Sequence, residues 1–305
     1  MLLLMPLAPV KADEGMWLLP LLEKMNSGKM TELGFEITPQ QIYDINNSSL
    51  KDAIVIFGGG CTGEIVSDQG LLFTNHHCGF GTIQSLSSVE HNYLRDGYWA
   101  LSLDEELPAP GLSVRFLESF TDVTADVNKA LAKAKTSEDK EKAMTKLQNK
   151  LAKKAGCDGK FIVGGINSFY GGNTYYFIVY KVFRDVRFVG APPQAIGKFG
   201  ADTDNWMWPR HTGDFSIFRV YADQNNNPAE YSEDNVPYTP KQYLKVSIAG
   251  YEEGSPAMIM GYPGSTNRFM TASELRETTE KNEAAIKVRT LRQDVLMADM
   301  EADPK

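Results

Sequence analysis

The sequence has few cysteines, an excess of acidic over basic residues, and no hydrophobic run of membrane-spanning length. Three cysteines in 305 residues exclude a small protein held together mainly by disulfides, and neither a Cys-x-x-Cys nor a His-Glu-x-x-His motif indicates a metal site. Lysine and arginine number 31 against 39 aspartates and glutamates, a net charge of −8. Such a chain is poorly suited to a phosphate backbone, so nucleic acid is not an expected partner.

Low-complexity tracts and internal repeats are also lacking, which excludes a largely disordered chain and a repeat array. Hydrophobic residues make up 42% and charged residues 23% of the sequence, as in ordinary globular proteins. At roughly 150 residues per domain, this length predicts two domains, or one large domain with an extension.

Residues 1–12 form an apolar segment that ends in Val-Lys-Ala and is followed by two acidic residues. The segment resembles the second half of a secretory signal peptide and is too short for a membrane-spanning helix of roughly 20 residues. We therefore expect a signal-peptide remnant at 1–12 and an exported protein with no membrane span. An oxidising compartment would also allow one pair of cysteines to form a disulfide.

Short apolar runs separated by glycine predict a mainly β protein. The expected strands are Ala53–Phe57, Gly63–Ser67, Gly70–Thr74, Tyr175–Phe183, Asp185–Val189, Phe215–Tyr221 and Ala257–Met260. Helical spacing or composition predicts a helix over Met16–Gly34, a helix or helical hairpin with a solvated face over Ala125–Gly156, and a helix over Thr271–Met300.

Residues 58–81 contain two adjacent histidines, His76 and His77, directly after an expected strand and directly before Cys78. A neutral imidazole titrates near working pH, so a histidine held here can act as a general base. Adjacent side chains point in different directions, so at most one of the two is expected to be the base. A histidine bonded to backbone carbonyls in a structural role is the alternative.

Cys61 and Cys78 bracket two expected strands joined by a turn, and a hairpin could bring them together as a disulfide. Spacing alone does not choose the pair, and Cys157 is the third candidate. A zinc site is a weaker interpretation, because consecutive His-His-Cys ligands cannot easily surround one tetrahedral ion.

Residues 200–214 combine two tryptophans, an arginine, a histidine and three acids between glycines and a proline, which predicts a rigid polar loop of the kind that carries sites. Asp214 precedes an expected strand, where its carboxylate could orient a histidine and stabilise the imidazolium. Asn205 and Trp206 offer a carbonyl acceptor and an aromatic wall suited to an ammonium group. A turn packed by its tryptophans is the alternative.

A histidine and aspartate pair implies a nucleophile, and the sequence contains no Gly-x-Ser-x-Gly motif. Ser255 and Ser265 lie in expected turns and are weak candidates.

Several long motifs resemble the bacterial serine exopeptidases of the dipeptidyl-peptidase 7 and 11 type. They are DEGMWL at 13–18, GCTGEIVSDQGLLFTNHHC at 60–78, FVGAPP at 188–193, GKFGADTDNWMWPRHTGD at 197–214, FSIFRVYAD at 215–223 and MIMGYPGST at 258–266. The resemblance implies a chymotrypsin-like double β-barrel peptidase with an inserted helical domain, in the periplasm or at the surface of a Gram-negative bacterium.

The resemblance also implies roles for individual residues. His77 would be the general base, Asp214 the acid of the triad, and Asn205 and Trp206 the residues that bind the substrate's N-terminal ammonium group. Cys61 and Cys78 would form the disulfide beside the histidine. No cofactor or metal is implied, and the expected partners are peptides with a free N-terminus and a second copy of the full-length protein.

In the family, the nucleophilic serine, the oxyanion-hole glycine and the residue that governs specificity belong to a C-terminal part that has no counterpart here. We therefore expect 13–266 to be the N-terminal part of the catalytic domain and 267–305 the beginning of a truncated α-helical domain, inactive by itself. The runs Phe57–Gly60 and Pro110–Val114 favour the dipeptidyl-peptidase 7 branch, which prefers apolar residues before the cleaved bond.

Two other function classes are compatible with the residues. One is a non-catalytic peptide-binding protein that keeps the ammonium site without a nucleophile. The other is a metallohydrolase that uses His76, His77 and His211.

Overall fold

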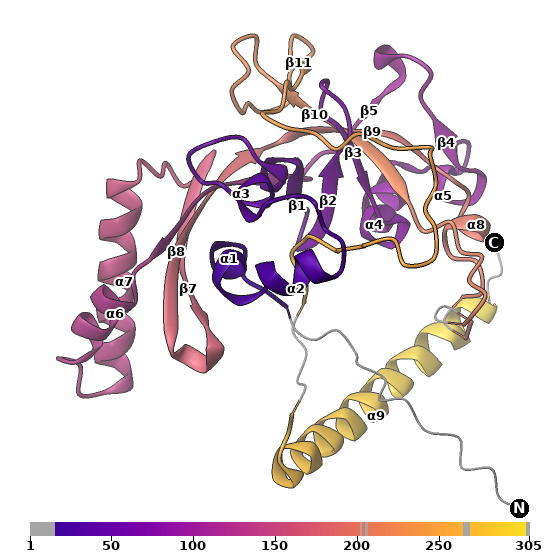
Figure 1. Cartoon of the computed structure of the whole chain (residues 1–305). Helices are drawn as coiled ribbons and strands as arrows, with labels where there is room; N and C mark the ends of the chain where they lie inside the picture. Colours follow the sequence, from indigo (N-terminus) through magenta and orange to yellow (C-terminus); the bar gives the residue numbers. More distant parts are fainter. Residues whose placement is uncertain (1–15, 202, 205–206, 265–268, 303–305) are drawn as a thin grey trace, which may run out of the picture. The chain divides into compact units, whose positions relative to one another are not determined.

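The computed structural model describes residues 16–201, 203–204, 207–264 and 269–302. The chain divides into two compact units, Met1–Pro263 and Gly264–Lys305. The first unit is built on one large sheet, and the second consists mainly of one long helix (Figure 1).

The sheet has eleven strands, all paired antiparallel, in the order β4-β9-β10-β3-β2-β1-β6-β8-β7, with β5 beside β9 and β11 beside β10. Its strands are β1 (Ile54–Phe57), β2 (Cys61–Ile65), β3 (Leu71–Thr74), β4 (Tyr98–Trp99), β5 (Leu107–Pro108), β6 (Val114–Asp122), β7 (Ile162–Phe169), β8 (Thr174–Phe183), β9 (Asp185–Ala191), β10 (Ser216–Ala222) and β11 (Val236–Pro237). The expectation of a mainly β fold is confirmed.

One expected strand, Ala257–Met260, is wrong. These residues pair with no strand among the described residues, and Ile259 is fully exposed. An apolar run of this length becomes a strand only where another strand completes its hydrogen bonds. Five strands were not predicted: the short strands β4, β5 and β11, and the longer strands β6 and β7, which flank β8 in the sheet.

The main core lies on the central strands, where alternate side chains turn inward. Four phenylalanines in it, Phe57, Phe183, Phe188 and Phe218, are at most 1% exposed. The ring of Phe218 lies 4.8 Å from that of Phe57 and 5.4 Å from that of Phe188, measured between ring centres. The strand β10 is therefore anchored in the core directly beside β3.

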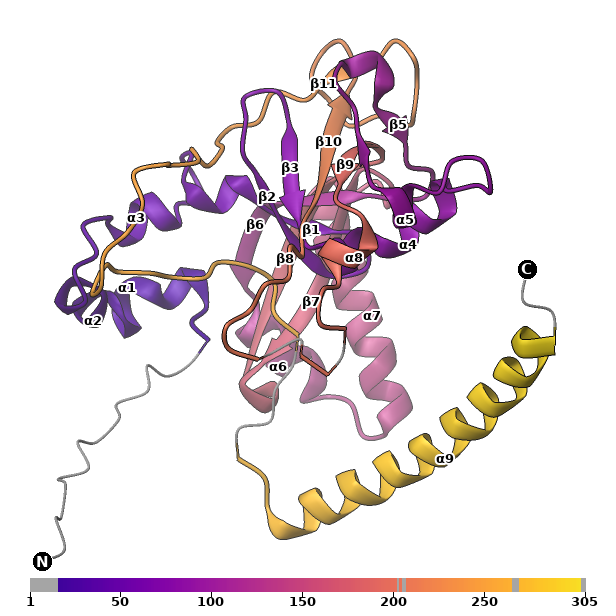
Figure 2. The ribbon, with the colours of Figure 1, turned by 90° about the vertical axis from the view of Figure 1, so that its right-hand side faces the viewer.

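A helical hairpin, α6 (Thr124–Leu131) and α7 (Ser137–Lys154), packs beside β7 and β8 (Figure 1 and Figure 2). A second hydrophobic core lies between the hairpin and these strands, and it contains the fully buried Val127 together with Phe177 and Val179. The capping box at Thr136 and Asp139 begins α7, as their spacing favours. For Ala125–Gly156 we expected a helix or a helical hairpin, and the structure has the hairpin, in which no residue of α7 is buried.

The region predicted as one N-terminal helix is divided at Asn26 into α1 (Leu22–Met25) and α2 (Ser27–Glu32). The other short helices are η1 (Leu19–Leu21), α3 (Pro39–Ile42), η2 (Leu50–Ala53), α4 (His76–Leu86), α5 (Tyr93–Asp96), η3 (Leu103–Glu105), η4 (Tyr170–Gly172) and α8 (Gln194–Gly197).

The second unit contains α9 (Ala272–Ala302), which matches the helix predicted over Thr271–Met300. Thr271 and Glu274 bond reciprocally at its start, the amide of Glu274 donating to the Thr271 hydroxyl at 3.3 Å. None of its described residues is buried. Among the described residues, no helix has the length and apolar character needed to cross a membrane.

Candidate active site

The two histidines lie in the first turn of α4, which begins two residues after the end of β3. The sequence analysis predicted no helix here, but the chain enters one directly after Asn75. Successive helical residues point about 100° apart, and the two rings therefore have different environments. The His76 side chain is 1% exposed, whereas that of His77 is 69% exposed.

His77 contacts Asp214 through two hydrogen bonds. Its Nδ1 lies 2.8 Å from Oδ2 of Asp214, and its backbone amide donates to Oδ1 at 3.1 Å. Because a carboxylate only accepts, the neutral ring carries its proton on Nδ1 and leaves the Nε2 lone pair free to take a proton. The Asp214 side chain is 13% exposed. The carboxylate is therefore mostly shielded from solvent, whereas the His77 ring is accessible.

The pairing of β10 with β3 brings the two residues together. Ser216 lies opposite Thr74 in the register of the two strands, which places the residues just before β10 beside those just after β3. Residues 137 positions apart in the sequence thus meet where β3 ends and β10 begins, at adjacent strands inside the sheet. Arg210 approaches the same carboxylate, with its guanidinium 3.9 Å from Oδ2 of Asp214.

Sequence reasoning missed two further residues, Asn75, which bonds to Asp214, and Ser216, which bonds to Asn75. Nδ2 of Asn75 donates to the Asp214 carbonyl at 3.2 Å and to Oδ2 at 3.4 Å. The Ser216 hydroxyl donates to the Asn75 carbonyl at 2.9 Å. An asparagine just before a helix is an ordinary capping signal, but this side chain makes no cap and bonds to the acid instead.

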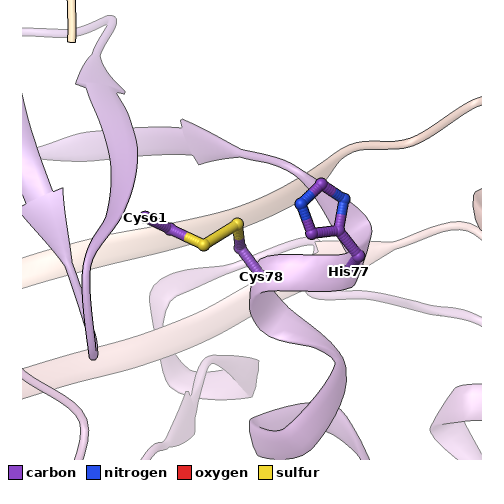
Figure 3. Close-up of side chains that lie close together, drawn as sticks. All are labelled: Cys61, His77 and Cys78. Atoms are coloured by element: carbon purple, nitrogen blue, oxygen red, sulfur yellow. A yellow bond between two sulfur atoms is a disulfide. The ribbon is translucent and has the colours of Figure 1, made fainter. Parts of the chain in front are cut away.

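A disulfide joins Cys61, at the start of β2, to Cys78 in the first turn of α4. Figure 3 shows the bridge next to His77 at the end of the helix. Cys61, His77 and Cys78 are also the one group of three potential metal ligands within the described part of the chain. Both sulfur atoms are bonded to each other, so neither is a thiolate that could hold a metal ion.

His76 faces the interior, and burial lowers the pKa of its imidazole below the usual 6.5, with the nearby Asp214 charge acting in the opposite direction. Hydrogen bonding to the Pro192 backbone also raises this pKa, and Nε2 of the ring has no partner. A neutral ring with no access to solvent is not placed to exchange protons with a substrate. The geometry is therefore consistent with a single base.

The remaining candidate residues are His211, Ser255, Asn205, Trp206 and Ser265. Asn205, Trp206 and Ser265 lie outside the described residues. The His211 ring packs edge-on against Phe199, with 6.4 Å between ring centres. The Ser255 hydroxyl accepts from the Glu252 amide at 3.0 Å, and no described contact joins it to His77.

Known proteins resemble the chain over nearly its whole length. Residues 12–305 match the protein family described as Peptidase S46. The chain is 52% identical to a dipeptidyl-peptidase 7 and 53% identical to an Asp/Glu-specific dipeptidyl-peptidase, both of Porphyromonas endodontalis. Each alignment covers 96% of this chain. A crystal structure of Porphyromonas endodontalis DPP11 with the dipeptide Arg-Glu superposes with a TM-score of 0.89 at 52% identity and 96% coverage of this chain.

The coverage of the relatives themselves is much smaller. The chain spans 36% of the dipeptidyl-peptidase 7, 42% of the Asp/Glu-specific dipeptidyl-peptidase and 43% of the DPP11 chain in the crystal structure.

Proposed function

Because the chain belongs to the Peptidase S46 family, we propose that it forms the N-terminal part of a serine dipeptidyl-peptidase that releases dipeptides from the free N-terminus of peptides. The observation that carries the proposal is the contact of His77 with the shielded carboxylate of Asp214, 2.8 Å from Nδ1 to Oδ2. A histidine oriented by an acid and exposed at its other nitrogen is the arrangement that activates a serine.

In the proposed reaction, Nε2 of His77 takes the hydroxyl proton of the serine as its oxygen attacks the carbonyl carbon of the second peptide bond. The imidazolium then gives the proton to the leaving amine, and water releases the dipeptide from the acyl-enzyme by the same two transfers. Asp214 stabilises the transient imidazolium and keeps the ring in the correct tautomer. We propose that the serine belongs to the part of the relatives' length that this chain does not span.

Asn205 and Trp206 are proposed to bind the substrate's α-ammonium group. They lie on the 200–214 segment, which ends at Asp214, so the ammonium site and the acid of the triad are carried by one stretch of chain. Binding of this group would restrict cleavage to the second peptide bond. The crystal structures of DPP11 with Arg-Glu and Arg-Asp support a peptide ligand of this length.

For the residue before the cleaved bond, we propose an apolar preference, on the basis of the sequence runs Phe57–Gly60 and Pro110–Val114. The overall identities of 52% and 53% to the two kinds of relative do not discriminate between them, so this part of the proposal depends on the two runs. Export to the periplasm or cell surface and a homodimeric full-length protein complete the proposal. The Cys61–Cys78 disulfide supports an oxidising compartment.

The test uses fluorogenic substrates and the complete polypeptide that contains this chain. We expect release of the fluorophore from a dipeptide with leucine at the second position, weaker release from the aspartate analogue, and none from N-acetylated versions. Release from the acetylated substrates would contradict the exopeptidase assignment. Peptide binding to the complete polypeptide without any hydrolysis would instead support the alternative, a non-catalytic peptide-binding protein.

A further inference from the structure

His76, the neighbour of the proposed base, lies in direct contact with the backbone of α8. A methyl group built on Gly197 would lie 2.3 Å from Cδ2 and 2.7 Å from Nε2 of the His76 ring. No side chain fits between them, so the ring is seated against the glycine itself. No positive φ accompanies Gly197, so close approach, rather than backbone conformation, requires glycine here.

The hydrogen bond from this ring to the Pro192 backbone explains why a histidine, rather than a hydrocarbon side chain, occupies the position. With Nε2 unpartnered, the donor to Pro192 is Nδ1. A buried acceptor without a partner is unfavourable, and a leucine or phenylalanine would fill the space without one. Histidine combines a hydrogen-bond donor to Pro192 with a ring that packs against Gly197, and neither leucine nor phenylalanine provides both.

The segment seated on His76 is the base of the loop that ends at Asp214. The Gly213 amide donates to the Ile196 carbonyl at 3.0 Å, which closes the loop next to Gly197. The Thr212 hydroxyl donates to the Phe199 carbonyl at 2.8 Å and ties the two sides again. Since Asp214 follows directly and bonds to His77, two adjacent histidines hold one loop, His76 at its base and His77 at its end.

We propose that His76 is a positioning residue that fixes residues 192–197, and through their contacts residues 212–214, relative to His77, and thereby sets the length of the released product. The inference rests on the proposed function, in which this segment binds the substrate's α-ammonium group. A dipeptidyl-peptidase must hold that group one dipeptide away from the base, and small misplacements at such a site have large effects on rate. His76 connects α4, which carries the proposed base, to Gly197, the first residue of the 197–214 stretch in which Asn205 and Trp206 occur.

The experiment separates the two contacts of the ring in the complete polypeptide. His76→Phe keeps an aromatic ring and loses the donor to Pro192, whereas His76→Asn keeps an N–H donor near the Nδ1 position and loses the ring. Gly197→Ala places a methyl group against the His76 ring, and Gly81→Ala is its control, because Gly81 lies on α4 with nothing within 4 Å of an added methyl. His91→Asn controls for the loss of an exposed histidine.

The readouts are KM, kcat and the lengths of products from an unlabelled decapeptide. We expect His76→Phe and Gly197→Ala to raise KM by about tenfold with a much smaller change in kcat, and to release tripeptides or single residues beside dipeptides. His76→Asn should lie between these variants and the wild type. Gly81→Ala and His91→Asn should behave as the wild type.

A double-mutant cycle covers the case in which Gly197→Ala folds poorly. In the His76→Ala background the added methyl has room, so Gly197→Ala should then change KM by less than threefold, a non-additivity expected of residues in contact. Equal effects of Gly197→Ala in both backgrounds, or dipeptides as the only product of every variant, would overturn the inference. Absence of dipeptide release by the wild type would instead overturn the proposed function.

Discussion

At the residue scale, two adjacent histidines have different environments because they begin a helix. The His77 side chain is turned out to solvent and bonded to Asp214, and His76 is turned inward beneath α8. The sequence alone indicated that at most one of the pair could be a base, and the helical turn leaves the His77 ring exposed and the His76 ring buried. The Asp214 contact was predictable from the residue types, but Asn75 and Ser216 were not, because their roles depend on the register of β3 and β10.

Replacing the acid tests the role of Asp214 with little change in shape. Asp214→Asn in the complete polypeptide should lower kcat by about 10⁴-fold, because an amide that donates to Nδ1 stabilises the wrong tautomer of His77. Steady-state turnover of a fluorogenic dipeptide measures the loss. Asp68→Asn, at an exposed aspartate, is the control and should retain full activity.

Burial of His76 predicts a pH-dependent stability. Its pKa is lowered in the folded state, so unfolding takes up a proton below the unfolded value of about 6.5, and stability decreases as the pH falls from there. Urea unfolding at pH 7.5 and 5.5 should therefore show a loss of up to about 1 kcal/mol in the wild type that His76→Asn lacks. Equal losses in both proteins would contradict the assignment, and His91→Asn should match the wild type.

At the element scale, predictions succeeded where the pattern was regular and failed where it was interrupted. The register of β6 shifts between Leu117 and Ser119, and Glu118, which pairs with two lysines on the surface, breaks its alternation. In β7, the Phe177 ring would lie 2.7 Å from a methyl group added to Gly164, so this position has no space for a side chain. The glycine interrupts the apolar pattern from which a strand is predicted. Both strands depend on pairing with β8, which no local pattern reveals.

The Cys61–Cys78 disulfide ties β2 to the helix that carries His77. Replacing both residues with serine should lower the free energy of unfolding by about 2 to 4 kcal/mol, as expected for a loop of this length. Chemical denaturation without reductant measures the change. Cys157→Ser, which leaves the bridge intact, should have a much smaller effect, and equal effects would contradict a structural role for the bridge.

The helical hairpin should be anchored by its buried face. Val127→Ala removes two methyl groups from a fully buried position on α6 and should cost about 1 to 3 kcal/mol of stability. Val89→Ala, at a side chain that is 92% exposed, should cost less than about 0.5 kcal/mol. Thermal unfolding compares the two, and similar shifts would show that the hairpin does not depend on this core.

At the scale of the whole molecule, the sheet is well packed but the segment after β11 is not. Val246, Ile248, Tyr251 and Ile259 are each at least 70% exposed, although their composition favours burial. Isolated apolar side chains on a surface are ordinary, but a run of them marks a surface suited to association. Composition alone could not indicate which of the apolar runs would find partners in the sheet.

This exposure predicts that the 305-residue chain self-associates by itself. Replacing Ile248 and Ile259 together with lysine should lower its binding of a hydrophobic dye and shift sedimentation toward the monomer. Val89→Lys adds the same charge at an exposed valine outside the segment and should change neither. An unchanged sedimentation profile in the double variant would contradict the prediction.

In the proposed reaction, His77 activates a serine, and dipeptides are released from a free N-terminus. The most direct measurement is mass spectrometry of products from one peptide, with its α-amine free or acetylated, incubated with the complete polypeptide or its His77→Ala variant. We predict dipeptides from the free peptide and the wild type, none from the acetylated peptide, and a loss of about 10⁴-fold or more in rate in the variant. Dipeptide release by His77→Ala at the wild-type rate would contradict the account.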